Sequence, residues 1–160
     1  MRPLRFPRVL LCVLPVLALH YGAASAQDLP NSGFVAGTSE ELSSMELADG
    51  RIARRMFFSV SVVADDAENP FGNASQDCFA TYVFETDGSP VGGRGVCDGI
   101  NADGDIWWIS LELRPDGLIH WEHIGGTGRL ANVRSSGTTT TLAEFEDGKI
   151  VGRFEGTRSR

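Results

Sequence analysis

Two of the chain's three histidines lie in one short segment, His120-Trp121-Glu122-His123, together with a carboxylate. On a β-strand, His120 and Glu122 share a face and His123 points the other way. The two imidazoles therefore cannot bind one metal ion without distorting the strand, and we expect no zinc site. His120 and Glu122 could instead form an acid/base pair in an enclosed site, as weak catalytic candidates. Two polar strand residues that face solvent are the simpler interpretation, which we favour.

Residues 101–105 (NADGD) carry polar and acidic side chains at alternate positions, as the start of a calcium-binding loop does, with Glu112 at its twelfth position. However, Ile106 stands where such a loop needs glycine, and the residues after it are typical of a strand. A turn in which Asp98 and Asp103 bond the local backbone explains the segment better. We therefore predict no metal ion, and the sequence contains no dinucleotide or P-loop motif that would bind another cofactor.

Three tryptophans, Trp107, Trp108 and Trp121, are candidates to line a ligand-binding cavity. Trp107 and Trp108 are adjacent, so on a strand one faces the core and the other lies outside, on a contact surface or beneath a loop. Aromatic lining of a cavity is one interpretation of these residues. Simple packing in a hydrophobic core is the other, and it is the one we favour.

The elements that must position these residues are β-strands. In the segment 56–64, Phe58, Val60 and Val62 alternate with serines, which is the period of a half-buried strand. The chain has no segment of sustained helical periodicity. The predicted strands are residues 56–64, 79–85, 91–96, 105–113, 118–124, 138–146 and 149–156.

Residues 27–55 have a weaker pattern. We expect a poorly structured N-terminal segment there, with one short strand near Phe34 and a loop or brief helix around Glu40–Leu47. The β domain then spans residues 56–160. Short turns and the lack of covering helices leave sheet edges that closure would remove. We therefore predict an all-β fold, a closed antiparallel barrel of about eight strands in mostly meander order.

Turn signals fix how neighbouring strands pair. Asp87-Gly88 and Asp147-Gly148 predict two-residue hairpin loops of type I′, and Arg114–Gly117 (RPDG) predicts a type I turn. With Asp87-Gly88 as the loop, Cys78 lies directly opposite Cys97. The sequence therefore predicts a disulfide between them, which an exported chain with an even number of cysteines also favours. Two free or metal-binding thiols are the alternative.

The N-terminus has the three parts of a cleavable signal peptide. Three arginines precede an apolar run from Val9 to Leu19, and Ala24-Ser25-Ala26 supplies the cleavage pattern. The apolar run is too short to span a bilayer as a helix. We expect residues 1–26 to be removed near Ala26 and the mature protein to be secreted or periplasmic.

Cleavage changes the charge of the chain. The signal peptide carries three arginines and no acid, so its loss takes the formal net charge from −7 to −10. An acidic domain repels phosphate backbones, which argues against nucleic acid as a partner. No second stretch of membrane-spanning length follows, so we expect no membrane span in the mature chain.

The segment 124–137 (IGGTGRLANVRSSG), followed by residues 138–157, resembles the C-terminal half of the allene oxide cyclase and dirigent barrel families. There a Gly-Gly-[Ser/Thr]-Gly run ends one strand and leads into two final strands, and Gly125-Gly126-Thr127-Gly128 matches this run. Leu130 stands where Phe is usual, and Asn132 where Gly is usual. Gly95-x-Cys97 and Asp103-Gly104-Asp105 are also similar to the small exported bacterial members of this group.

The resemblance implies an eight-stranded barrel in which the glycine run forms a structural turn. It carries over no catalytic residue, because the matched positions belong to that turn. Such barrels include cyclases and non-catalytic guides of coupling reactions, and many form homo-oligomers. The fold therefore does not by itself choose a function.

Three functions fit these observations. The first, which we favour, is a barrel that binds a small apolar or aromatic molecule in its interior without chemistry of its own. The second is a cofactor-independent isomerase or cyclase resembling allene oxide cyclase, with His120 and Glu122 pointing inward. The third is a structural or interaction protein with a packed interior.

Overall fold

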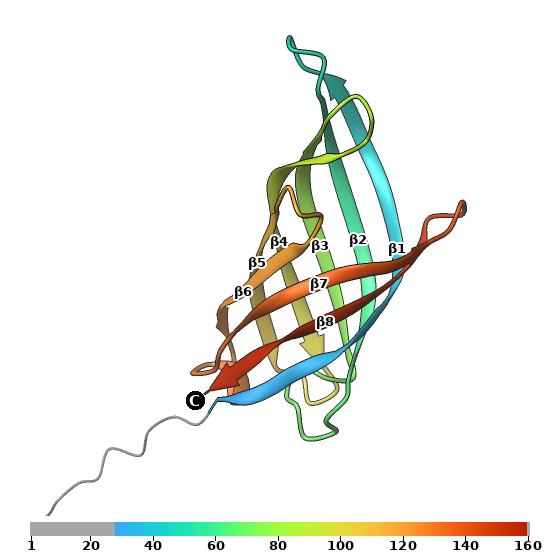
Figure 1. The fold of residues 1–160 in the computed structure, drawn as a ribbon. Coiled ribbons are helices and arrows are strands. Elements are labelled where there is room, and N and C mark those ends of the chain that lie inside the picture. The colour runs from blue at the N-terminus through green and yellow to red at the C-terminus, as the bar shows by residue number, and fades with distance from the viewer. Residues whose placement is uncertain (1–27, 160) are drawn as a thin grey trace, which may run out of the picture.

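Eight antiparallel strands follow one another around a closed barrel (Figure 1). The computed structural model describes residues 28–159, so the predicted signal peptide lies outside the described residues. Each strand pairs with the next along the chain, and β1 pairs with β8 to close the sheet. The predicted all-β antiparallel meander barrel is confirmed. The strands are β1 (Leu29–Glu46), β2 (Ile52–Ala64), β3 (Ala74–Phe84), β4 (Pro90–Asn101), β5 (Ile106–Leu113), β6 (Ile119–Gly126), β7 (Arg134–Glu144) and β8 (Lys149–Ser159), with a short 3-10 helix η1 (Gly128–Leu130) before β7.

The prediction for residues 27–55 was wrong over most of its length. Instead of one short strand followed by a loop or helix, β1 runs for 18 residues and pairs with β2 as far as Glu46 and Ile52. The far end of this hairpin projects beyond the rest of the barrel (Figure 1). Residues 40–46 are all exposed there, so no apolar face marks them as a strand. Backbone pairing with β2 forms this part of β1, and the side-chain pattern does not reveal it.

Five hairpin turns within residues 28–159 share one geometry. In each turn the first residue's N–H donates to the carbonyl of the fifth, and the fourth residue's N–H donates to the carbonyl of the first. The fourth residue is always glycine, with φ between 79° and 86°. The turns are residues 47–51, 85–89, 101–105, 114–118 and 145–149.

This geometry corrects one prediction and supports another. Asp87-Gly88 and Asp147-Gly148 do not form type I′ loops, because only the glycine of each pair has a positive φ. The loops are three residues long instead of two. The turn predicted at Arg114–Gly117 is present, with the Gly117 N–H donating to the Arg114 carbonyl.

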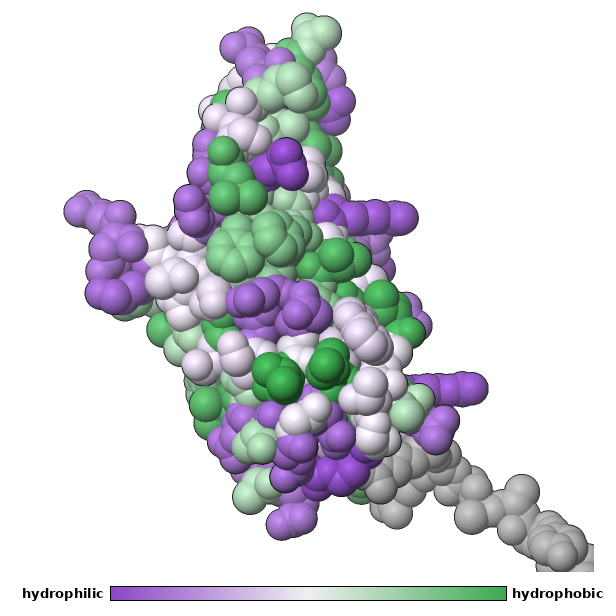
Figure 2. Space-filling view, turned by 180° about the vertical axis from the view of Figure 1, so that it is seen from behind, coloured by the Kyte–Doolittle hydropathy of each residue, from purple (hydrophilic) through white to green (hydrophobic). Residues whose placement is uncertain are grey.

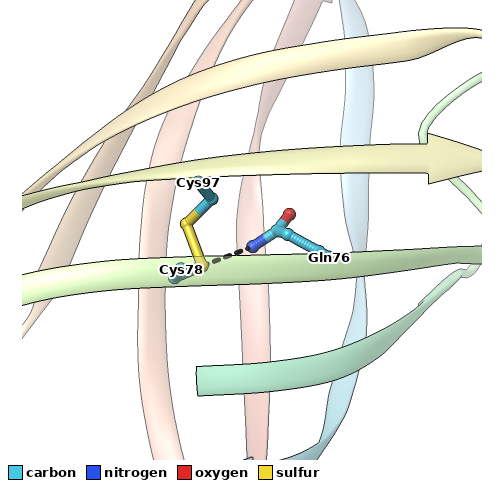
Figure 3. Close-up of a disulfide and its surroundings, with 3 residues drawn as sticks. All are labelled: Gln76, Cys78 and Cys97. Atoms are coloured by element: carbon cyan, nitrogen blue, oxygen red, sulfur yellow. Dashed lines mark hydrogen bonds between the residues drawn. A yellow bond between two sulfur atoms is a disulfide. The ribbon is translucent and has the colours of Figure 1, made fainter. Parts of the chain in front are cut away.

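The longer loop does not break the predicted cysteine pairing. Phe84 faces Pro90 next to the turn, but Val83 faces Gly92, so Val91 is an extra residue that forms a β-bulge. The bulge offsets the extra loop residue and restores the predicted register beyond it. Cys78 therefore faces Cys97, with Cα atoms 4.0 Å apart, and the two are joined by the predicted disulfide (Figure 3).

The core fills one end of the barrel. Phe71, from the loop between β2 and β3, and Leu130 and Val133, from the segment between β6 and β7, are all buried there. Polar side chains join the same plug, since Asn69 donates to Asn31 and Asn31 donates to Ser135, each at 2.7 Å. Within residues 28–159, no helix is long and apolar enough to cross a membrane.

Candidate functional site

The other end of the barrel contains a cavity of about 560 Å³. Gly88 and Gly117, which belong to two of the hairpin turns, line its mouth, while Phe71 lies at its floor. The volume lies within the range of pockets that bind small molecules, about 300–1,000 Å³. The strands thus enclose a site that is closed at one end and open at the other.

The wall of the cavity is mostly apolar because alternate residues of each strand point inward. Among its lining residues, the ionisable ones are Arg54, Tyr82 and Glu144. Arg54 lies 3.5 Å from Glu41 as an ion pair. The apolar and aromatic lining includes Val35, Met56, Phe58, Val60, Val62, Ile109, Leu111, Leu113, Ile119 and Phe154.

Two buried donors in the cavity wall have no hydrogen-bond partner among the described residues. They are the Tyr82 hydroxyl and the Trp121 Nε1–H. Burial raises the pKa of Tyr82 to about 12, so its phenol stays protonated near neutral pH and can donate. Unpaired buried donors are costly, and an acceptor on a bound molecule would satisfy them.

The tryptophans separate as the strand alternation requires. Trp107 is 1% exposed and Trp121 is 8% exposed, and both line the cavity. Trp107 packs edge-on against Phe71, with ring centroids 5.7 Å apart. Trp108 lies on the outer face and is 42% exposed. Gly99 makes room for the inner ring, because a Cβ there would lie 2.3 Å from the Trp107 ring.

His120 and Glu122 lie on the outside of the barrel, on the face opposite to Trp121. Neither lines the cavity; both border a shallow depression on the outer surface together with Glu112. His120 Nε2 is 3.7 Å from an Asp116 carboxylate oxygen. The favoured interpretation, polar residues on an outer strand face, agrees with this geometry.

His123 points inward, toward the plug below the cavity. Its Nδ1 lies 2.7 Å from the Val133 carbonyl, and because a carbonyl only accepts, Nδ1 carries the proton. Its ring packs edge-on against Phe71, with centroids 5.3 Å apart. Burial lowers the pKa of His123, against the opposing effect of the Val133 hydrogen bond. His123 is thus a neutral part of the plug.

The Gly125-Gly126-Thr127-Gly128 run ends β6 and begins the turn into η1. Thr127 Oγ1 accepts the Ile106 N–H at 2.8 Å, and the Thr127 N–H donates to the Ile106 carbonyl at 2.7 Å. Gly128 has φ 50°, and a Cβ there would collide with the Asp105 carboxylate. These contacts tie the turn to the start of β5.

Residues 101–105 form one of the repeated hairpin turns. Asn101 Oδ1 accepts the N–H groups of Asp103 and Asp105, at 3.0 and 2.9 Å. Arg129 forms an ion pair with Asp103, and its backbone N–H donates to Asp105. The turn interpretation was right, but Asn101 makes the backbone contacts that Asp98 and Asp103 were expected to make.

Sequence reasoning missed Arg54, Tyr82 and Glu144. The first two had a usable signal, since Arg54 has the same parity as Phe58 on β2 and Tyr82 the same parity as Cys78 on β3. Extending the period of two along each strand would have placed both inside. Glu144 had no such signal, because a β-bulge between Thr141 and Ala143 shifts the alternation of β7.

The fold is similar to two solved structures of plant-type names, although no family model matches the chain and no curated protein matches it. One is the pterocarpan synthase dirigent protein GePTS1, with a TM-score of 0.57, 9% sequence identity and 88% of each chain covered. The other is the pterocarpan synthase dirigent protein PsPTS1, with a TM-score of 0.53, 11% identity, and coverage of 84% of this chain and 96% of that one. At these identities the likeness concerns the fold. This chain thus has a barrel structurally similar to the dirigent proteins, as its glycine run indicated.

Proposed function

We propose that this protein binds a small, mostly apolar or aromatic molecule in the barrel cavity, without catalysing a reaction. The observation that carries the proposal is the open cavity of about 560 Å³ with its apolar wall and aromatic floor. Burial of an apolar ligand there would contribute roughly 25 cal/mol per Å² of surface removed from water. The likeness to dirigent proteins supports a barrel interior as the binding site.

The unpaired donors narrow the chemistry of the ligand. Tyr82 and Trp121 present an O–H and an N–H without partners among residues 28–159. The ligand therefore carries an acceptor, such as a carbonyl or ether oxygen, on an apolar or aromatic frame. A purely hydrocarbon ligand would leave both donors unsatisfied.

The two other functions that the sequence suggests have less support. A solidly packed interior does not fit a cavity of this size. A cyclase that uses His120 and Glu122 is disfavoured because both side chains lie outside the barrel. The Cys78–Cys97 disulfide and the dirigent-like fold are consistent with an extracytoplasmic protein. We propose that it is secreted or periplasmic, after cleavage near Ala26.

The test uses the oxidised mature chain and the neutral aromatic probe N-phenyl-1-naphthylamine, whose fluorescence rises in apolar surroundings. Thr139 lines the cavity, so Thr139→Phe fills part of it and we expect at least about a tenfold loss of probe affinity. Thr140 lies outside on the same strand, so Thr140→Phe is the matched control and should bind as the original does. Near-ultraviolet circular dichroism checks that both variants fold.

Native mass spectrometry of protein from its own host then looks for a bound small molecule. With that molecule or another acceptor-bearing aromatic, Tyr82→Phe should weaken binding about fivefold to tenfold, while binding of the hydrocarbon anthracene stays unchanged. Equal probe binding by the Thr139→Phe and Thr140→Phe variants would contradict the cavity as the site. So would a failure of the original chain to bind the probe.

A further inference from the structure

Three apolar side chains lie next to one another on the outer face of β2, β3 and β4. Phe57 is in register with Phe79, and Phe79 with Val96; we call these three residues the apolar row. The rings of Phe57 and Phe79 have centroids 4.9 Å apart. Phe79 is 53% exposed and Val96 is 56% exposed. Figure 2 views the molecule from this side and shows apolar atoms across the middle of the surface.

Charged residues of opposite sign flank the apolar row. Two positions away along the strands on one side, Arg55 on β2 and Arg94 on β4 form a basic row. Two positions away on the other side, Asp77 on β3 and Asp98 on β4 form an acidic row. The outer face therefore reads basic, apolar and acidic in order along the strands.

This order is complementary to itself. If a twofold axis runs along the apolar row, rotation places the apolar row of one copy on that of the other. The same rotation brings the basic row over the partner copy's acidic row, with Arg94 over the position of Asp98. A twofold interface uses the same patch on both subunits, so this match is what such an interface requires. We propose that a second copy of this chain binds here and forms a twofold homodimer.

Two contacts support a charged partner at this face. The Arg94 side chain is 84% exposed and its nearest acidic group, Glu112, is 3.7 Å away, so it is free to reach across an interface. Asp77 Oδ1 is a buried oxygen without a hydrogen-bond partner in the described part of the chain. A guanidinium or hydroxyl from a facing copy would satisfy it.

A second copy fits this face better than other occupants. An anionic membrane or a nucleic acid would be repelled by the acidic row. A stable interface buries about 800 Å² on each partner, so the contact must include the flanking charged rows as well as the apolar row. The cavity mouth lies at the end of the barrel, so dimer formation leaves it open. The dimer is thus independent of the proposed ligand.

Sedimentation velocity of the oxidised mature chain, over a range of protein concentrations, tests the proposal. We expect a dimer for the original chain and a monomer for Phe79→Glu, which places a charge on the axis. Arg94→Asp faces Asp98 of the other copy with a like charge, so it should raise the dimer Kd at least about tenfold. Asp98→Arg should do the same for the opposite reason.

The double variant Arg94→Asp/Asp98→Arg restores opposite charges across the interface, and its Kd should return to within about threefold of the original. Leu142→Glu is the control, because Leu142 is 56% exposed but belongs to β7, outside this face. Thermal unfolding confirms that each variant is folded. A monomer at every concentration, a trimer, or a double variant no tighter than its single variants would overturn the proposal.

Discussion

His120 and His123, three positions apart on β6, lie in opposite environments: one on the outer face beside Asp116, the other against Phe71 inside the barrel. Their spacing alone predicted that they face opposite ways. It did not reveal which of them would be enclosed. At this scale, chemistry depends on burial, since burial lowers the pKa of His123 and raises that of Tyr82 to about 12.

Burial of His123 makes stability depend on pH. Its pKa in the folded chain lies below the ordinary value of 6.5, so the unfolded chain binds more protons as the pH falls through 6.5. The contribution of His123 to the free energy of unfolding is complete above pH 6.5 and is lost as the pH falls toward the folded-state pKa.

Replacement His123→Gln removes this titration and keeps a donor for the Val133 carbonyl. We expect the original chain to lose more free energy of unfolding between pH 7 and pH 5 than the variant does. Urea unfolding at both pH values measures the difference, and comparing the change within each protein cancels the cost of the substitution itself. An identical pH dependence in both proteins would show that His123 does not titrate in this window.

Among the elements, the repeated Asp-Gly turns decide how the strands pair. In four of the five, the aspartate Oδ1 accepts the N–H of the residue two positions on; for Asp87 and Ser89 this distance is 2.9 Å. The glycine that follows takes the positive φ. The sequence predicted turns at these positions, but it could not distinguish two-residue from three-residue loops, because Asp-Gly serves both.

Gly88→Ala isolates the backbone contribution of one turn. Gly88 has φ 86°, and a Cβ there would meet nothing within 4 Å, so only the conformational preference changes. We expect a loss of about 1 kcal/mol in the free energy of unfolding, measured with urea. Gly88→Asn should lose less, because asparagine tolerates a positive φ better than alanine does. Equal losses for the two variants would contradict this account.

For the whole molecule, closure of the barrel brings β1 against β8 and creates the interior. The disulfide acts within this frame, joining β3 to β4 on the inner side, where Gln76 Nε2 donates to Cys78 Sγ at 3.2 Å (Figure 3). Cys78 and Cys97 are 19 positions apart, so the bond closes a hairpin and none of the barrel's long-range contacts depends on it directly.

Reduction should therefore weaken the barrel without opening it. The chain-entropy model gives a loss of about 3 kcal/mol for a loop of this length. We expect urea unfolding with dithiothreitol to show this loss, while the far-ultraviolet circular dichroism of the native state keeps its β signal. The variant Cys78→Ala/Cys97→Ala should be insensitive to dithiothreitol. A reduced chain without β structure would show that closure requires the bond.

The sequence by itself determined the strands from Met56 onward, the turns between them and the partner of Cys78. These depend on local alternation and turn chemistry, which are readable from neighbouring residues. It missed most of β1, whose exposed far end has no apolar pattern. Only the tertiary structure decided that the interior is open, that Tyr82 and Arg54 line it and that His120 does not. Those outcomes depend on closure and on bulges, which combine residues far apart in the chain.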